Sequence, residues 1–197
     1  MERFKSVLVE DGEALRTMAA YIDLNPVRAG IVKDPKDYRW SGYGEATGGG
    51  KAARCGLCHV VGHGERGERA WETPGVAGGM SASEVYRGWL FEDGKTGESV
   101  AAGGTTKGGK KQAGIAKESV AAEKKRRGKL SRSELLGCRV RYFSDGLVIG
   151  SKGYVEGIFQ RYRGLFGPKR NDGARSIKED AQGSLFTARK LRGRTVG

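Results

Sequence analysis

The middle of this chain limits most strongly what it can fold into. Residues 101–114, "AAGGTTKGGKKQAG", and residues 123–129, "EKKRRGK", are glycine-rich and lysine-rich, so burial cannot repay the entropy of ordering them. The 197 residues include 34 glycines and only 37% hydrophobic residues, which argues against one large core. We therefore predict a linker over residues 47–130, with one short helix near residues 83–91.

The linker separates two parts that can fold, residues 1–46 and residues 131–197. In the first part, β-branched and aromatic residues at 3–10 predict a strand that ends at the turn Asp11-Gly12. The next residues predict a helix whose apolar stripe is Leu15, Met18, Ala19 and Ile22. Tyr21 falls on the flank of that stripe, so we expect its side chain to point outward.

Asn25 and Pro26 follow on this helix. The residue before a proline disfavours helical geometry, and proline suits a first helical position, so we expect the helix to stop or kink at Asn25. The overall expectation for this part is a strand followed by a helix, within an α+β fold class.

The C-terminal part is predicted to be a small, mostly helical basic module. Ser131 and Glu134 form a capping-box pattern, "SDG" at 144–146 predicts a turn, and Ser151 is a candidate cap for a helix with Tyr154, Val155, Ile158, Phe159 and Tyr162 on one face. Two helices around a turn also allow a helix-turn-helix module in which residues 152–163 enter a DNA groove. The alternative is a solvated basic surface.

Charge is divided unevenly along the chain. Residues 1–100 hold 13 Lys/Arg and 15 Asp/Glu, whereas residues 101–197 hold 23 and 8. Such an asymmetry, with a net charge of +13, favours a polyanion as partner, most often nucleic acid. No apolar run is long enough to cross a membrane and no secretory signal is visible, so we expect a cytoplasmic protein without a membrane partner.

Cysteine and histidine cluster at residues 55–63. Cys55, Cys58, His59 and His63 have the side chains of a zinc site, and "CGLCH" also matches the attachment pattern for c-type haem. The close spacing of the four residues argues against zinc, and the lack of a visible export signal argues against haem. We favour a surface loop with free thiols, and metal binding stays open.

The most informative motifs are "YIDLNPVRAG" at 21–30 and "DYRWSGY" at 37–43. With the rest of residues 3–46, they resemble the end of the catalytic domain of the REP-associated tyrosine transposases, of the one-tyrosine HUH superfamily. The resemblance implies a ferredoxin-like domain that cuts and rejoins single-stranded DNA through a 5′-phosphotyrosine during transposition. Tyr21 matches the nucleophile, Asn25 matches the auxiliary ligand, and a divalent Mg or Mn ion is implied.

The family's other metal ligands come from a His-hydrophobic-His strand that precedes the matching block, and this sequence does not contain it. We therefore expect a C-terminal fragment of such a transposase that is inactive alone. The alternative is a non-catalytic DNA-binding remnant.

The expected partner is DNA, single-stranded or hairpin, and association with a second copy of the chain is left open. The candidate DNA contacts are basic residues: Arg3, Lys5, Arg28, Arg39, Lys124, Lys125, Arg126, Arg127, Arg161, Arg163, Lys169, Arg170 and Arg175, with Arg189, Lys190, Arg192 and Arg194 in the tail.

Overall fold

This computed structural model describes residues 6–74, 79–91, 143, 147–177 and 184–188. The chain divides into two compact units. Unit 1 combines residues 1–18 with residues 117–197, and unit 2 comprises residues 19–116. In the described part of the chain, no helix combines the length and apolar character that crossing a membrane requires.

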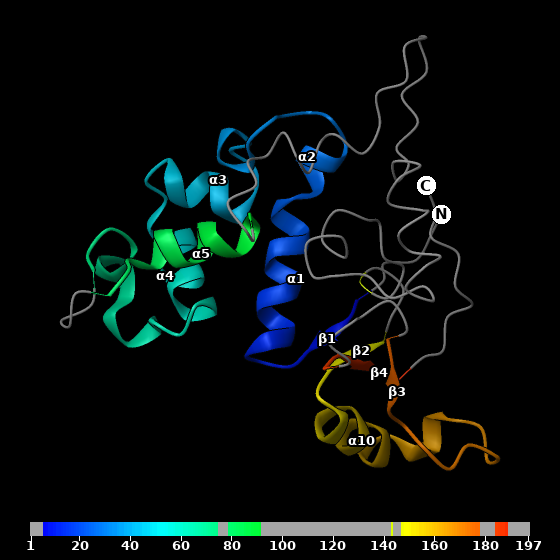
Figure 1. The fold of residues 1–197 in the computed structure, drawn as a ribbon. Coiled ribbons are helices and arrows are strands. Elements are labelled where there is room, and N and C mark those ends of the chain that lie inside the picture. Colours follow the sequence, from blue (N-terminus) through cyan, green and yellow to red (C-terminus); the bar gives the residue numbers. More distant parts are fainter. Residues whose placement is uncertain (1–5, 75–78, 92–142, 144–146, 178–183, 189–197) are drawn as a thin grey trace, which may run out of the picture. The chain divides into compact units, whose positions relative to one another are not determined.

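Unit 1 contains a four-stranded sheet in the order β1-β2-β4-β3 (Figure 1). Its strands are β1 (Leu8–Val9), β2 (Val148–Gly150), β3 (Arg175–Ser176) and β4 (Phe186–Thr187). β1 pairs in parallel with β2, whereas β2 and β3 both pair antiparallel to β4. The strand predicted within residues 3–10 is confirmed over Leu8–Val9, and it pairs with a segment from the far end of the chain.

Helix α10 (Lys152–Arg161) packs beside β2 and β4. Val148, Val155 and Ala188 form the centre of its buried contact with the sheet. The predicted cap is confirmed, because the Ser151 hydroxyl accepts the Tyr154 N–H at 3.3 Å. The Ser151 hydroxyl also donates to the Glu10 carboxylate at 3.0 Å, which ties the end of β1 to the start of α10.

The prediction that residues 131–197 form a mostly helical module misses the strands of the described part. Besides α10 and the short 3-10 helix η4 (Arg163–Leu165), residues 147–188 contain three strands. The helix-turn-helix alternative is also wrong for α10, because the residues directly before it form β2. The predicted capping box at Ser131 and Glu134 lies outside the described residues.

Helix α1 (Glu13–Asp23) confirms the predicted N-terminal helix, but its buried side differs from the predicted stripe. Ala14, Thr17, Met18, Ala20 and Tyr21 are buried, whereas Ile22 is 53% exposed. The prediction of an outward Tyr21 is therefore wrong: only 6% of it is exposed. Ala14, Thr17, Met18 and Tyr21 follow the i, i+3, i+4 and i+7 spacing, so they share one face of the helix, and the predicted stripe was centred on the wrong side.

Unit 2 is helical (Figure 1). After α2 (Asn25–Arg28) come η1 (Pro35–Asp37), α3 (Gly42–Thr47), α4 (Lys51–Val60), η2 (Gly64–Trp71) and α5 (Ala82–Leu90). Its core includes Tyr43, Cys58, Trp71, Tyr86 and Leu90, all at most 4% exposed. The short helix predicted near residues 83–91 is confirmed as α5, capped by Ser81.

The predicted domain boundaries need correction in two places. Residues 51–71 were predicted as linker, but α4 and η2 lie there and bury Leu57, Cys58 and Trp71. The expected N-terminal domain 1–46 is also divided, because β1 belongs to unit 1 while residues 19–46 belong to unit 2. The α+β fold class itself is confirmed.

Candidate nucleic-acid interface

Within the motif "YIDLNPVRAG", α1 ends at Asp23 and α2 begins at Asn25, so the predicted interruption of the helix is confirmed, but Asn25 itself is helical. Pro26 brings no N–H to a helical hydrogen bond, and Leu24 separates the two helices. Arg28 spans this interruption: its guanidinium donates to the Tyr21 carbonyl at 2.7 Å and to Asn25 Oδ1. The same guanidinium lies 4.0 Å from the centre of the Tyr21 ring, in cation–π geometry.

These contacts bear on the metal that the resemblance implies. One lone pair of Asn25 Oδ1 accepts a hydrogen bond from the Arg28 guanidinium, and the positive charge of Arg28 would repel a divalent ion at the same oxygen. Within the described residues, no group of three His, Cys, Asp or Glu side chains could hold a metal ion. The described donors therefore do not fit a divalent ion, and Arg28, a candidate DNA contact, links the ends of the two helices instead.

Asp23 is a buried carboxylate that the sequence analysis missed. Only 3% of it is exposed, and its carboxylate accepts the Tyr86 hydroxyl at 2.6 Å and the Tyr43 N–H at 3.2 Å. Burial raises the pKa of Asp23, although the hydrogen bonds from Tyr86 and Tyr43 oppose the rise. Burial, and then the charge of Asp23, also raise the pKa of Tyr86.

This buried carboxylate joins the two halves of the family-like block. Asp23 comes from "YIDLNPVRAG" and Tyr43 from "DYRWSGY", so the motifs meet through a hydrogen bond within unit 2. Arg87 extends the network, because it donates to the Tyr43 hydroxyl at 3.1 Å and to Asp34 at 3.0 Å. Much of the motif is thus explained by packing around Asp23.

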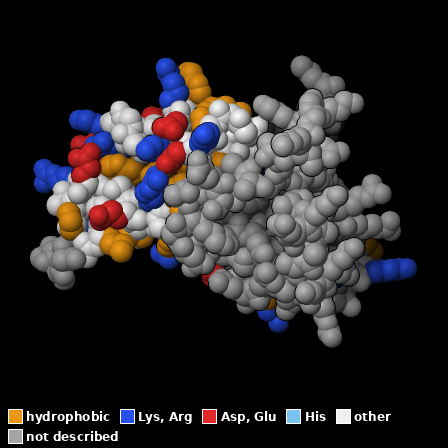
Figure 2. Space-filling model, turned by 45° about the horizontal axis from the view of Figure 1, so that its top comes forward, with side chains coloured by type: hydrophobic (Ala, Val, Ile, Leu, Met, Phe, Trp, Pro, Cys, Tyr) orange, Lys and Arg blue, Asp and Glu red, His pale blue; other side chains and the backbone are white. Residues whose placement is uncertain are grey.

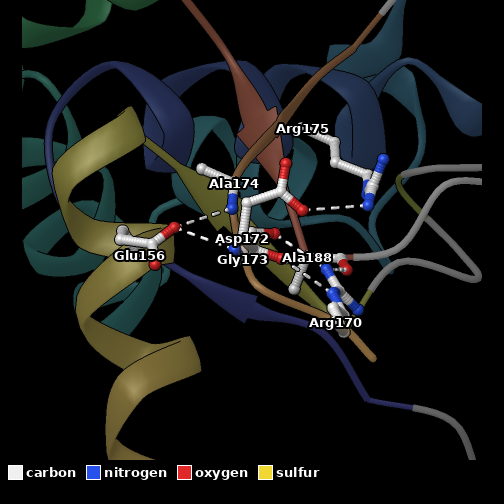
Figure 3. Close-up of polar contacts among 7 residues, drawn as sticks. All are labelled: Glu156, Arg170, Asp172, Gly173, Ala174, Arg175 and Ala188. Atoms are coloured by element: carbon white, nitrogen blue, oxygen red, sulfur yellow. Dashed lines mark hydrogen bonds and ion pairs between the residues drawn. The ribbon is translucent and has the colours of Figure 1, made fainter. Parts of the chain in front are cut away.

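In unit 1, the candidate DNA contacts Arg163, Arg170 and Arg175 have structural partners, and Figure 3 shows those of Arg170 and Arg175. Arg170 donates to the carbonyls of Asp172 at 2.9 Å, Gly173 at 2.8 Å and Ala188. Arg163 donates to the carbonyls of Phe166, Gly167 and Pro168 at 3.1 to 3.3 Å. Both guanidiniums therefore shape the loop after α10, and few of their donors remain for phosphate.

Aromatic rings complete this arrangement. The Phe159 and Phe166 ring centres are 5.0 Å apart, and the Arg163 and Arg170 guanidiniums lie 5.3 and 5.2 Å from the Phe159 ring centre. Burial, and then the charge of Arg175, lower the pKa of Arg170. The alternating arginine and aromatic residues thus stabilise the loop. From sequence alone, this role could not be distinguished from stacking on nucleic-acid bases.

Glu156 anchors the same loop from α10. Its carboxylate accepts the N–H groups of Gly173 at 2.9 Å and Ala174 at 3.1 Å, which lowers the pKa of Glu156 (Figure 3). Glycine is required at 173, because a Cβ there would lie 2.2 Å from Phe159 Cβ.

Other cations of this segment face solvent. Lys152, Arg161 and Lys169 are exposed, and within the part of the chain that the structure describes their side chains form no hydrogen bond or ion pair. Arg175 pairs with Asp172 at 3.0 Å. Two exposed apolar residues, Tyr162 at 46% and Leu165 at 84%, lie between Arg161 and Lys169 in the chain. Residues 161–169 therefore combine free cations with solvent-facing apolar groups.

The remaining predicted site residues divide as follows. Arg39 is exposed in unit 2. Arg3, Lys5, Lys124, Lys125, Arg126, Arg127 and the tail cations Arg189, Lys190, Arg192 and Arg194 lie outside the described residues. Cys55 and Cys58 are on α4, where Cys55 is exposed and Cys58 is buried, and the described structure does not assemble the four candidate zinc ligands into a site.

Comparison with known proteins found no matching family model, no matching curated protein and no matching solved structure.

Proposed function

We propose that this chain is a DNA-binding protein of the REP-associated tyrosine transposase type, acting in the cytoplasm, which binds single-stranded or hairpin DNA without cutting it. The observation that carries the proposal is the basic segment of unit 1. Residues 147–177 hold six Lys/Arg against two Asp/Glu, and Arg161 and Lys169 are exposed without partners among the described residues. Phosphate contacts of this kind supply most of the affinity in sequence-independent binding.

The family assignment is supported by the resemblance over residues 3–46. On this proposal, β1 and α1 are what is left of a ferredoxin-like domain. A nucleophilic tyrosine needs a hydroxyl that reaches the phosphate and a metal beside it. Tyr21 is buried and Asn25 is held by Arg28, so the proposal is binding without strand cleavage.

We predict that Arg161→Gln combined with Lys169→Gln weakens binding to single-stranded DNA about 5- to 10-fold, equally for unrelated sequences, because the two cations contact phosphates. The slope of log affinity against log salt should fall by about 1.4 in magnitude, since two phosphates are no longer neutralised. Fluorescence anisotropy of a labelled oligonucleotide, titrated at several salt concentrations, measures both quantities.

The matched control is Lys51→Gln combined with Arg69→Gln, which removes the same charge from exposed positions in unit 2. If both double variants lose affinity equally, the binding depends on net charge alone, and the assignment to residues 161–169 is wrong.

A further inference from the structure

The segment Tyr38–Ser41 in unit 2 forms a tight turn with Arg39 and Trp40 at its tip. The Tyr38 carbonyl accepts the Ser41 N–H at 3.1 Å and the Ser41 hydroxyl at 3.2 Å. The Ser41 hydroxyl in turn accepts the Gly44 N–H at 3.1 Å and caps α3. The turn is therefore fixed to α3 at both of its ends.

The packing of α3 against this turn leaves little freedom. A Cβ at Gly44 would lie 2.0 Å from the Tyr38 carbonyl oxygen, so only glycine allows the two backbones to approach this closely. The tip is thus held rigidly by backbone contacts, and neither Arg39 nor Trp40 is needed to hold it.

Trp40 gains little from folding at this position. It is 72% exposed, whereas Trp71 in the same unit is 3% exposed. The Arg39 guanidinium lies over the indole, 4.3 Å from the ring centre, and covers one face. With so much of the residue exposed, the other face of the indole is open to solvent.

We propose that Trp40 is a stacking platform for an unpaired base of single-stranded nucleic acid, with Arg39 as the second layer of the stack. This inference rests on the proposed function and adds to it a contact in unit 2, whereas the basic segment 161–169 belongs to unit 1. Base stacking on an aromatic ring tolerates any sequence, and a stacked arginine adds a cation near the strand.

The charges near the turn favour a polyanion over an apolar partner. Lys33, Lys36 and Arg39 are exposed in one short segment. Of its two carboxylates, Asp34 is paired with Arg87 at 3.0 Å and with Lys36 at 3.8 Å, and Asp37 is exposed. On the face in view, Figure 2 shows basic and acidic side chains beside exposed apolar ones on the described helical part.

The test compares two ligands with the same phosphates, a labelled oligothymidine and an abasic oligomer of equal length. Trp40→Ala in the full chain should weaken binding to oligothymidine about tenfold and leave the abasic oligomer unaffected. Trp40→Phe keeps a ring and should retain most of the affinity. Ile31→Ala, which removes a 63% exposed apolar side chain from the same unit, should change neither.

Tryptophan emission gives a second readout. Oligothymidine should quench the share of the wild-type emission that comes from Trp40. In Trp40→Phe the emission comes only from Trp71 and Trp89, and oligothymidine should not quench it.

Three results would overturn the inference. If the wild-type chain binds neither oligomer, the proposed function fails and the platform fails with it. If it binds both but Trp40→Ala changes neither affinity, only the platform is wrong. If Trp40→Ala leaves affinity unchanged and lowers the mass of the chain in solution, the turn contacts a second copy instead.

Discussion

Replacing Phe159 with alanine should destabilise the chain by about 3–5 kcal/mol, the usual cost of deleting a fully buried aromatic ring. Phe159 is 0% exposed and contacts Phe166, Arg163 and Arg170. The variant leaves a cavity, and it removes the ring on which two guanidiniums lie. Urea denaturation followed by circular dichroism measures the loss in free energy of unfolding.

Hydrogen exchange locates the effect of this variant. Amide protection should fall in α10 and at Gly173, because the lost side chain lies on α10 and packs against Gly173. The control is Leu165→Ala, which is 84% exposed and should change the free energy of unfolding by less than about 0.5 kcal/mol. Equal effects of the two variants would show that Phe159 is not a core residue.

Replacing Asp23 with alanine should destabilise unit 2 by about 2–4 kcal/mol, because the buried Tyr86 hydroxyl and Tyr43 N–H lose their acceptor. The loss should appear as reduced amide protection in α3 and α5. Tyr86→Phe removes the hydroxyl alone. In a double-mutant cycle, Asp23→Ala should cost at least about 1 kcal/mol less in the Tyr86→Phe background. Additive effects would contradict a direct hydrogen bond between the two side chains.

The same carboxylate predicts a pH dependence. Burial raises the pKa of Asp23 in the folded chain, so the folded state holds this proton more tightly than the unfolded state. The stability from protonated Asp23 is complete below its unfolded pKa, about 3.9, and is lost as pH rises through the folded value. The side chain in Asp23→Asn is neutral at every pH. The free energy of unfolding of this variant, relative to that of the wild type, should therefore rise as the pH increases from the unfolded to the folded pKa of Asp23. A constant difference would contradict the raised pKa.

The sequence predicted the helices that have strong local signals. Ser151 caps α10 as predicted, and the apolar spacing placed α5 within one residue, although the capping box of Ser81 and Glu84 was not predicted. It missed α4 and η2, because "TGGGK" resembles a linker and most apolar residues of α4 are small: Ala52, Ala53, Cys55 and Cys58. Tertiary packing of Leu57 and Trp71 provides the stability that local sequence does not indicate.

The sheet could not be predicted from local sequence. β3 and β4 have two residues each, too few for alternation to be visible, and Leu8 pairs with Val148 across 140 positions. The roles of the individual basic residues could not be predicted for a similar reason. Charge alone did not separate Arg163 and Arg170, which donate to loop carbonyls, from Arg161 and Lys169, which face solvent.

Filter binding of labelled hairpin and single-stranded DNA, with Mg or Mn present, tests most directly whether this chain binds DNA without cutting it. We predict that the filter retains the DNA at low salt. The affinity should fall about a thousandfold or more between about 50 and about 200 mM salt, and detergent should abolish retention. No retention at low salt would contradict DNA binding. A detergent-resistant adduct that Tyr21→Phe abolishes would instead show that Tyr21 cleaves DNA.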